Sequence, residues 1–136
     1  MAEGKIGIGA IKSGNTIPVK HFTMTAEKLI TDGPLVVTGV RKIYQTDADG
    51  NRTDNVIAIC YDTIDADYYS SPTIKVESSK AVVSADELEA SDSPILIKIP
   101  VTQTLVKPYC ISYGMVKASI VAPYVERVET DTNKKI

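Results

Sequence analysis

Two strand-like segments joined by a short polar stretch constrain the fold of this chain more than any other feature. Residues 34–46 (PLVVTGVRKIYQT) and 55–64 (NVIAICYDTI) are rich in Val, Ile, Thr and Tyr, which is typical of strands. Asp49, Gly50 and Asn51 between them are residues that favour tight turns. The pattern predicts a β-hairpin.

The turn of this hairpin also matches part of a calcium-binding loop. Asp47, Asp49 and Asn51 occupy the first, third and fifth ligand positions of such a loop. Arg52 stands where the sixth position needs Gly, and Ala58 stands where a Glu at the twelfth position closes the site. We therefore expect a solvated turn and no metal site.

Further strand-like segments follow the hairpin. Residues 71–83 predict a third strand, either continuous or broken at Ser78 and Ser79. Residues 93–128 predict further strands, with a tight turn at SYGMV, residues 112–116. Pro100 and Pro108 interrupt this part of the chain. Because proline has no N–H to donate to a neighbouring strand, we expect each to lie at an edge, a bulge or a strand end.

Two short helices are predicted between the strands. Ser84 and Glu87 form a capping box, in which each side chain satisfies a backbone N–H at the start of a helix. Thr25 and Gly33 are in the right positions to begin and end another short helix. The expected fold class is all-β with one or two short helices.

The length of the chain favours one domain. With 136 residues, of which 43% are hydrophobic, the chain has enough apolar side chains for a single core. We expect residues 1–33 to form an arm or extra strand plus a short helix in that domain, and residues 129–136 to form a flexible tail. The N-terminus shows no secretory signal and no membrane span, so we expect a cytoplasmic protein.

Few residues are suited to catalysis or metal binding. His21 is the only histidine, and Cys60 and Cys110 lie in apolar runs, where free, buried thiols are expected. Serine and aspartate lie mostly in turn-like or cap-like settings. The sequence predicts no enzyme, no catalytic residue, no metal, no cofactor and no small-molecule substrate.

Basic and aromatic residues alternate on the predicted hairpin. Lys42 and Tyr44 are two positions apart and project from one face of the strand, with Thr38 and Val40 before them. Arg41 points the other way unless a bulge intervenes.

A second basic and aromatic run lies near the C-terminus. Lys107, Tyr109, Ile111 and Tyr113 follow one another with period two, and Lys117 comes after the turn. Cations that follow phosphates and rings that stack on bases suit single-stranded nucleic acid.

Structural roles are the alternative for these residue types. Tyr61, Tyr68, Tyr69 and Tyr124 can be core or rim residues, and the lysines can be charges that keep strand edges soluble.

The succession of elements resembles a known family. A long hairpin, a third strand, a short helix and two further strands are the order of an OB-fold, a five-stranded Greek-key barrel. Residues 37–62 and 95–123 resemble the small single-stranded-DNA-binding-like proteins of Gram-positive phages and conjugative elements, within a match over residues 34–125. The resemblance implies an OB-fold-like barrel over residues 34–128 with an N-terminal extension.

The resemblance also implies a function. Such proteins bind single-stranded DNA without sequence preference during replication or transfer, as homo-oligomers, without a cofactor or a membrane. The residues expected to line the binding groove are Lys42, Tyr44, Arg52, Tyr61, Lys75, Lys107, Tyr109, Tyr113 and Lys117. The alternative function is a non-enzymatic structural or assembly protein of a phage or mobile element that acts through contacts between subunits.

Overall fold

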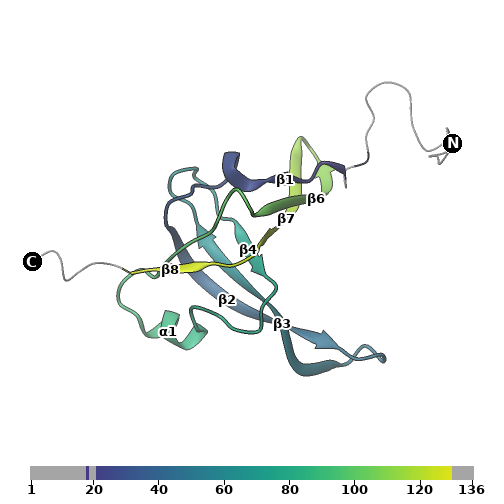
Figure 1. Ribbon diagram of the computed structural model, residues 1–136, viewed down its shortest axis with the longest axis vertical. Coiled ribbons are helices and arrows are strands. Elements are labelled where there is room, and N and C mark those ends of the chain that lie inside the picture. The colour runs from purple at the N-terminus through teal and green to yellow at the C-terminus, as the bar shows by residue number, and fades with distance from the viewer. Residues whose placement is uncertain (1–17, 19–20, 130–136) are drawn as a thin grey trace, which may run out of the picture.

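The computed structural model describes residue 18 and residues 21–129 of the chain (Figure 1). Most of the predicted N-terminal arm and nearly all of the predicted tail therefore lie outside the described residues. In the part described, no helix has the length and apolar character needed to cross a membrane.

Eight strands and two short helices make up the fold of the described residues. In chain order they are β1 (Met24–Thr25), the 3-10 helix η3 (Ala26–Lys28), β2 (Leu35–Thr46), β3 (Arg52–Ile64), β4 (Thr73–Val76), α1 (Ala85–Ala90), β5 (Leu96–Lys98), β6 (Leu105–Ser112), β7 (Met115–Ala122) and β8 (Glu126–Val128). The mainly β class predicted from the sequence is confirmed.

The strands form one open sheet, so the prediction of a five-stranded barrel is wrong. In the part of the chain that the structure describes, eight strands lie in the order β1-β6-β7-β4-β3-β2-β5-β8, and only β4 and β7 are parallel. The strand expected before residue 112 is divided into β5 and β6, with Pro100 in the gap, where a residue without an N–H cannot extend a ladder. The remaining extra strands, β1 and β8, are short and lie at the two ends of the sheet.

One stretch of chain pairs with two distant parts of this sheet. β5 pairs with the start of β2, and β6, which follows it along the chain, pairs with the whole of β7. The single stretch 96–112 therefore supplies a strand on each side of the array β7-β4-β3-β2, with β6 beside β7 and β5 beside β2.

The predicted β2–β3 hairpin and its turn are confirmed. The carboxylate Oδ1 of Asp47 accepts hydrogen bonds from the backbone N–H of Asp49 (3.0 Å) and of Asn51 (2.9 Å). Gly50 adopts a φ of 85°, a left-handed conformation that glycine takes without steric cost. The carboxylate at the first position of the calcium-loop pattern therefore serves the backbone of a turn.

A bulge near Gly39 changes the alternation of side chains along β2. The pairing with β3 shifts register between Val37 and Gly39. The buried Val37 and the partly buried Val40 both face the core although they are three positions apart. Lys42 and Tyr44 therefore continue the face of Val40, as the sequence predicted. The predicted place of Thr38 on that face is wrong, because Thr38 is the extra residue at the register shift and is exposed.

The other local predictions hold to different extents. Ser84 Oγ accepts a hydrogen bond from Glu87 N–H at 3.0 Å and caps α1. The turn at Tyr113 and Gly114 joins β6 to β7. The helix expected between Thr25 and Gly33 is only the single turn η3, whose N-cap side chain makes no capping hydrogen bond.

Both prolines lie where they were predicted, whereas the third strand is shorter than predicted. Pro108 lies at a register shift of β6, and Pro100 lies between strands, as expected. The third strand is shorter than residues 71–83 because β4 ends at Val76, after which the chain turns at Ser78.

The hydrophobic core lies on one side of β2, β3 and β4. Leu35, Ile59, Tyr61, Ile74 and Ile97 are among its fully buried members. Side chains from β5 and from the segment before α1 cover them, since Ile97 and Val83 belong to the same cluster. Strand pairing and core therefore fix the base of the hairpin firmly.

A buried carboxylate joins the β3–β4 connection to the segment after η3. Asp65 is fully buried, and its Oδ2 accepts a hydrogen bond from Thr31 N–H at 2.9 Å. Its Oδ1 accepts hydrogen bonds from Asp67 N–H (3.1 Å) and Tyr68 N–H (3.2 Å). Three backbone donors therefore share one carboxylate, which is stabilising because buried N–H groups need acceptors.

Removing this carboxylate is expected to destabilise the fold. Asp65→Ala should lower the free energy of unfolding by about 3 kcal/mol, because three N–H groups lose a charged acceptor. Asp65→Asn, which keeps one carbonyl oxygen, should cost about half as much. Urea unfolding followed by circular dichroism measures both changes. Asp49→Ala at the exposed hairpin tip is the control, and an equal loss in that variant would contradict the assignment.

Candidate nucleic-acid interface

A groove lies between the projecting end of the β2–β3 hairpin and the segment that leads into α1. β4 pairs with β3 only from Ile59 to Asp62, so the remainder of the hairpin extends beyond the sheet (Figure 1). The groove has a volume of about 680 Å³. Its lining residues are Val40, Lys42, Tyr44, Arg52, Ser79, Lys80, Ala81, Val83, Ser84, Ala85 and Asp86. We call this feature the hairpin groove.

Three of the residues predicted for the binding site meet in the hairpin groove. Lys42 and Tyr44 reach it from β2 and Arg52 from the start of β3. The guanidinium carbon of Arg52 lies 3.9 Å from the centre of the Tyr44 ring. A cation over an aromatic face at this distance is worth about 0.5–1 kcal/mol at an exposed site. The contact favours this placement of the Arg52 guanidinium over the Tyr44 ring.

Lys80 was not predicted and belongs to the same groove. Together with Lys42 and Arg52 it gives the lining three cations against one acid, Asp86. Ser78 Oγ accepts a hydrogen bond from Lys80 N–H at 3.2 Å, which fixes a tight turn just before it. The adjacent serines at the end of the third predicted strand were the signal that a loop, and not a strand, begins there.

Tyr61 does not belong to any exposed binding face, which corrects its predicted role. Only 1% of it is exposed, and its hydroxyl oxygen accepts a hydrogen bond from Val82 N–H at 3.0 Å. Burial raises the pKa of the Tyr61 hydroxyl, because the charged phenolate is disfavoured away from water. Tyr61 therefore supports the groove from beneath, by fixing the segment that carries Lys80.

Lys75 lies on the other face of the sheet. It is half-buried on β4 and pairs with Cys60 of β3, which in turn pairs with Arg41 of β2. Lys42 follows Arg41 and projects from the opposite face. Lys75 is thus separated from the hairpin groove by the thickness of the sheet.

The last four predicted residues form a separate group on the β6–β7 hairpin. Tyr109 is 65% exposed and Tyr113, in the turn, is fully exposed. Lys107 and Lys117 are exposed on β6 and β7. This hairpin lies away from the tip of the β2–β3 hairpin (Figure 1), so the structure does not bring the nine predicted residues into one site.

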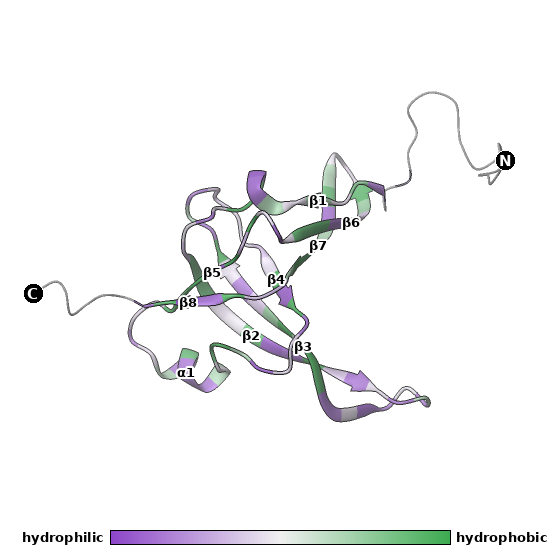
Figure 2. Ribbon diagram, in the orientation of Figure 1, coloured by the Kyte–Doolittle hydropathy of each residue, from purple (hydrophilic) through white to green (hydrophobic). Residues whose placement is uncertain are grey.

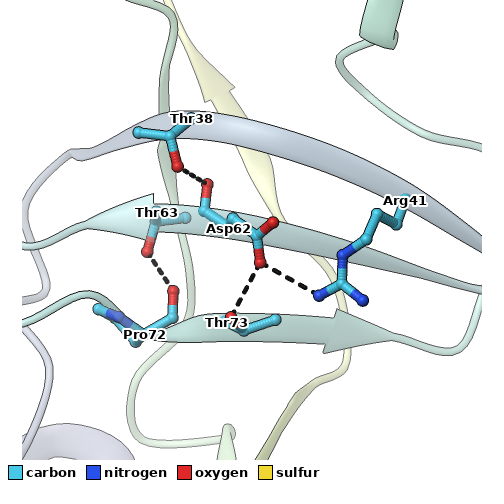
Figure 3. Close-up of polar contacts among 6 residues, drawn as sticks. All are labelled: Thr38, Arg41, Asp62, Thr63, Pro72 and Thr73. Atoms are coloured by element: carbon cyan, nitrogen blue, oxygen red, sulfur yellow. Dashed lines mark hydrogen bonds and ion pairs between the residues drawn. The ribbon is translucent and has the colours of Figure 1, made fainter.

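A polar network on the outer face accounts for Arg41. Figure 3 shows Asp62 between Arg41 and Thr73: its Oδ1 accepts hydrogen bonds from Arg41 at 3.1 Å and from the Thr73 hydroxyl at 2.9 Å. The Arg41 guanidinium holds the pKa of the Asp62 carboxyl below its usual value, and the carboxylate raises the pKa of Arg41. Arg41 is therefore engaged away from the groove.

The lowered pKa of Asp62 predicts a pH-dependent contribution to stability. Its folded-state pKa lies below the unfolded one, so the contribution is complete above about pH 4 and is lost as the pH falls through the folded pKa. At neutral pH, Asp62→Asn should lower the free energy of unfolding by on the order of 0.5 kcal/mol, because both partners are well exposed to solvent. Urea unfolding at a series of pH values measures this gap.

The control for this prediction is an exposed aspartate on the same strand. Asp54→Asn removes the same charge from β3, and its effect should be smaller than that of Asp62→Asn at neutral pH. A gap between the wild type and Asp62→Asn that stays constant down to about pH 2 would contradict the ion pair as its source.

The described residues form no cluster that suggests a metal centre. Among them, no group of three or more His, Cys, Asp or Glu side chains is placed to hold a metal ion, and Cys60 and Cys110 are both free. The hairpin groove offers instead an aromatic ring and three cations on an open surface. No family model, no curated protein and no solved structure matches this chain.

Proposed function

We propose that this protein binds single-stranded DNA without sequence preference, during the replication or transfer of a phage or conjugative element. The observation that carries the proposal is the hairpin groove, in which Tyr44 and Arg52 are stacked and flanked by Lys42 and Lys80. Cations neutralise phosphates, and the exposed side of an aromatic ring or of a guanidinium offers a stacking face to any base. Neither interaction depends on base identity.

The geometry of the groove favours a single strand over a duplex. The ring of Tyr44 comes from a strand and lies within a concave surface whose opposite wall is residues 79–86. A base has to leave its stack to reach such a ring, which costs nothing further in an unpaired strand. The acids of the turn, Asp47 and Asp49, lie at the hairpin tip, so a phosphate chain should pass along the groove below the tip.

The strand order supports an OB-like origin in a looser form than a closed barrel. The five longest strands are neighbours in the order β6-β7-β4-β3-β2, and residues 96–112 pair at both ends of this array. A partly open Greek-key barrel has the same property, and such barrels bind oligonucleotides through the loops and strands at their mouth.

Binding of labelled oligo-dT, measured by fluorescence anisotropy at two salt concentrations, tests the proposal. The full chain should bind single-stranded DNA more tightly than duplex DNA. If Lys42, Arg52 and Lys80 each neutralise one phosphate, log K should fall with log salt with a slope of about −2. Tyr44→Ala should weaken binding roughly 5- to 150-fold, the cost of losing one stacked base. Lys42→Ala should reduce the slope by about 0.7.

Matched variants away from the groove are the controls. Lys98→Ala removes an exposed cation from β5, and Tyr68→Ala removes a partly exposed ring from the β3–β4 connection. Both should leave affinity and salt slope unchanged. No binding at low salt to a long oligonucleotide would overturn the proposal, and a stable oligomer that ignores DNA would favour the assembly-protein alternative.

A further inference from the structure

A smaller hollow, of about 120 Å³, adjoins the hairpin groove. The groove lies beside the projecting end of the β2–β3 hairpin, along which Figure 2 shows hydrophilic stretches. One segment of chain separates the two cavities: Ala81 and Val83 line the groove, and Ser78 and Val82 line the smaller hollow. Lys80 lines both. We call the smaller cavity the side hollow.

The floors of the two cavities are also adjacent. Val40 of β2 lines the groove and Tyr61 of β3 lines the side hollow, and these residues are partners in the β2–β3 ladder. Partner residues of antiparallel strands lie about 4.5–5.5 Å apart. The Tyr61 hydroxyl accepts a hydrogen bond from Val82 N–H and so fixes the segment between the cavities. A flexible strand that leaves the groove can therefore enter the side hollow by passing Lys80.

Tyr124 offers an aromatic ring at the side hollow. It lies in the connection between β7 and β8 and is 44% exposed. Ala122 before it is buried and pairs with Val76 of β4, Pro123 restricts the backbone, and Val125 after it belongs to the core. The backbone at Tyr124 is therefore anchored on both sides, which lowers the entropic cost of using this ring in binding.

The charges around Tyr124 favour phosphate on one side of it. Among the described residues, the lining of the side hollow carries one cation, Lys80, and no acid. Tyr124 also lines a neighbouring hollow, in which the acids Asp32 and Glu126 outnumber Lys98. Because like charges repel, a phosphate is disfavoured in that neighbouring hollow. A strand that comes from the groove should therefore end at Tyr124.

We propose that the side hollow is a second nucleotide subsite, in which a base stacks on Tyr124 while Lys80 contacts a phosphate between this base and the one at Tyr44. The subsite rests on the proposed function, because it takes the same strand of DNA as the hairpin groove. It accepts any base, since neither stacking nor the neutralisation of phosphate depends on base edges. Each subunit then contacts bases on two rings, one at each side of Lys80.

Fluorescence anisotropy of labelled oligo-dT with the full chain measures the contribution of Tyr124. Tyr124→Ala should weaken binding roughly 5- to 150-fold and leave the salt slope unchanged, because a stacked base is lost but no cation. Tyr124→Phe, which keeps the ring, should bind as the wild type does. Tyr124→Leu, which keeps apolar bulk without a ring, should also weaken binding and decides the matter if the alanine variant fails to fold.

Tyr68→Ala is the matched control, because Tyr68 is 45% exposed and lies in a different connection, between β3 and β4. Its affinity for oligo-dT should equal that of the wild type. Photocrosslinking of the wild type gives a second measurement that needs no variant. Oligo-dT that carries 5-iodouracil should crosslink on irradiation to Tyr124 as well as to Tyr44, because the reactive base contacts both rings.

Failure of the subsite and failure of the proposed function give different results. A wild type that binds no DNA would overturn both. A wild type whose affinity falls with Tyr44→Ala but with neither Tyr124→Ala nor Tyr124→Leu, and which crosslinks at Tyr44 without Tyr124, would overturn the subsite alone. An equal loss of affinity in Tyr124→Phe or in Tyr68→Ala would also overturn it, because the loss would not then come from the Tyr124 ring.

Discussion

The bulge near Gly39 determines what each face of the longest strand pair can do. Because of it, the buried Val37 and the partly buried Val40 both face the core. Each later side chain of β2 lies on the face opposite to the one that strict alternation from Val37 would give it. Lys42 and Tyr44 then lie on the side of the hairpin that faces the segment before α1. Without the extra residue, these two side chains would project from the outer face, and the groove would contain neither.

Gly39 also makes room for the polar network on that outer face. A Cβ atom at Gly39 would lie 2.9 Å from Oδ2 of Asp62, closer than two such atoms approach. Asp62 cannot easily retreat, because Arg41 and Thr73 both donate hydrogen bonds to its other oxygen. One residue without a side chain thus lets a bulge and an ion pair occupy the same place. The bulge, the network and the groove are therefore consequences of one local geometry.

Local signals in the sequence predicted local structure well. The turn at Asp47 to Asn51, the cap at Ser84 and the turn at Gly114 each depend on a few neighbouring residues, and all three are present. Pairings between distant segments left no such signal, so the divided strand, the short edge strands and the open sheet were not predicted. The same limit explains why the role of Tyr61 was wrongly predicted and why Lys80 was missed. The burial of Tyr61 and the approach of Lys80 depend on which segment packs over the sheet, which period-two patterns do not reveal.

The β2–β3 and β6–β7 hairpins each project beyond the sheet, and the side chains that they leave uncovered differ in polarity. Each extends beyond the sheet, so side chains that would face the core in a longer sheet have no layer of protein above them. On β2 these positions are Lys42 and Tyr44, whose polar groups remain hydrated. On β6 and β7 they are Ile111 and Val116, whose exposure costs free energy until they are covered. A charged, hydrated groove suits a ligand whose affinity depends on salt, which supports our proposal that nucleic acid binds at the first hairpin.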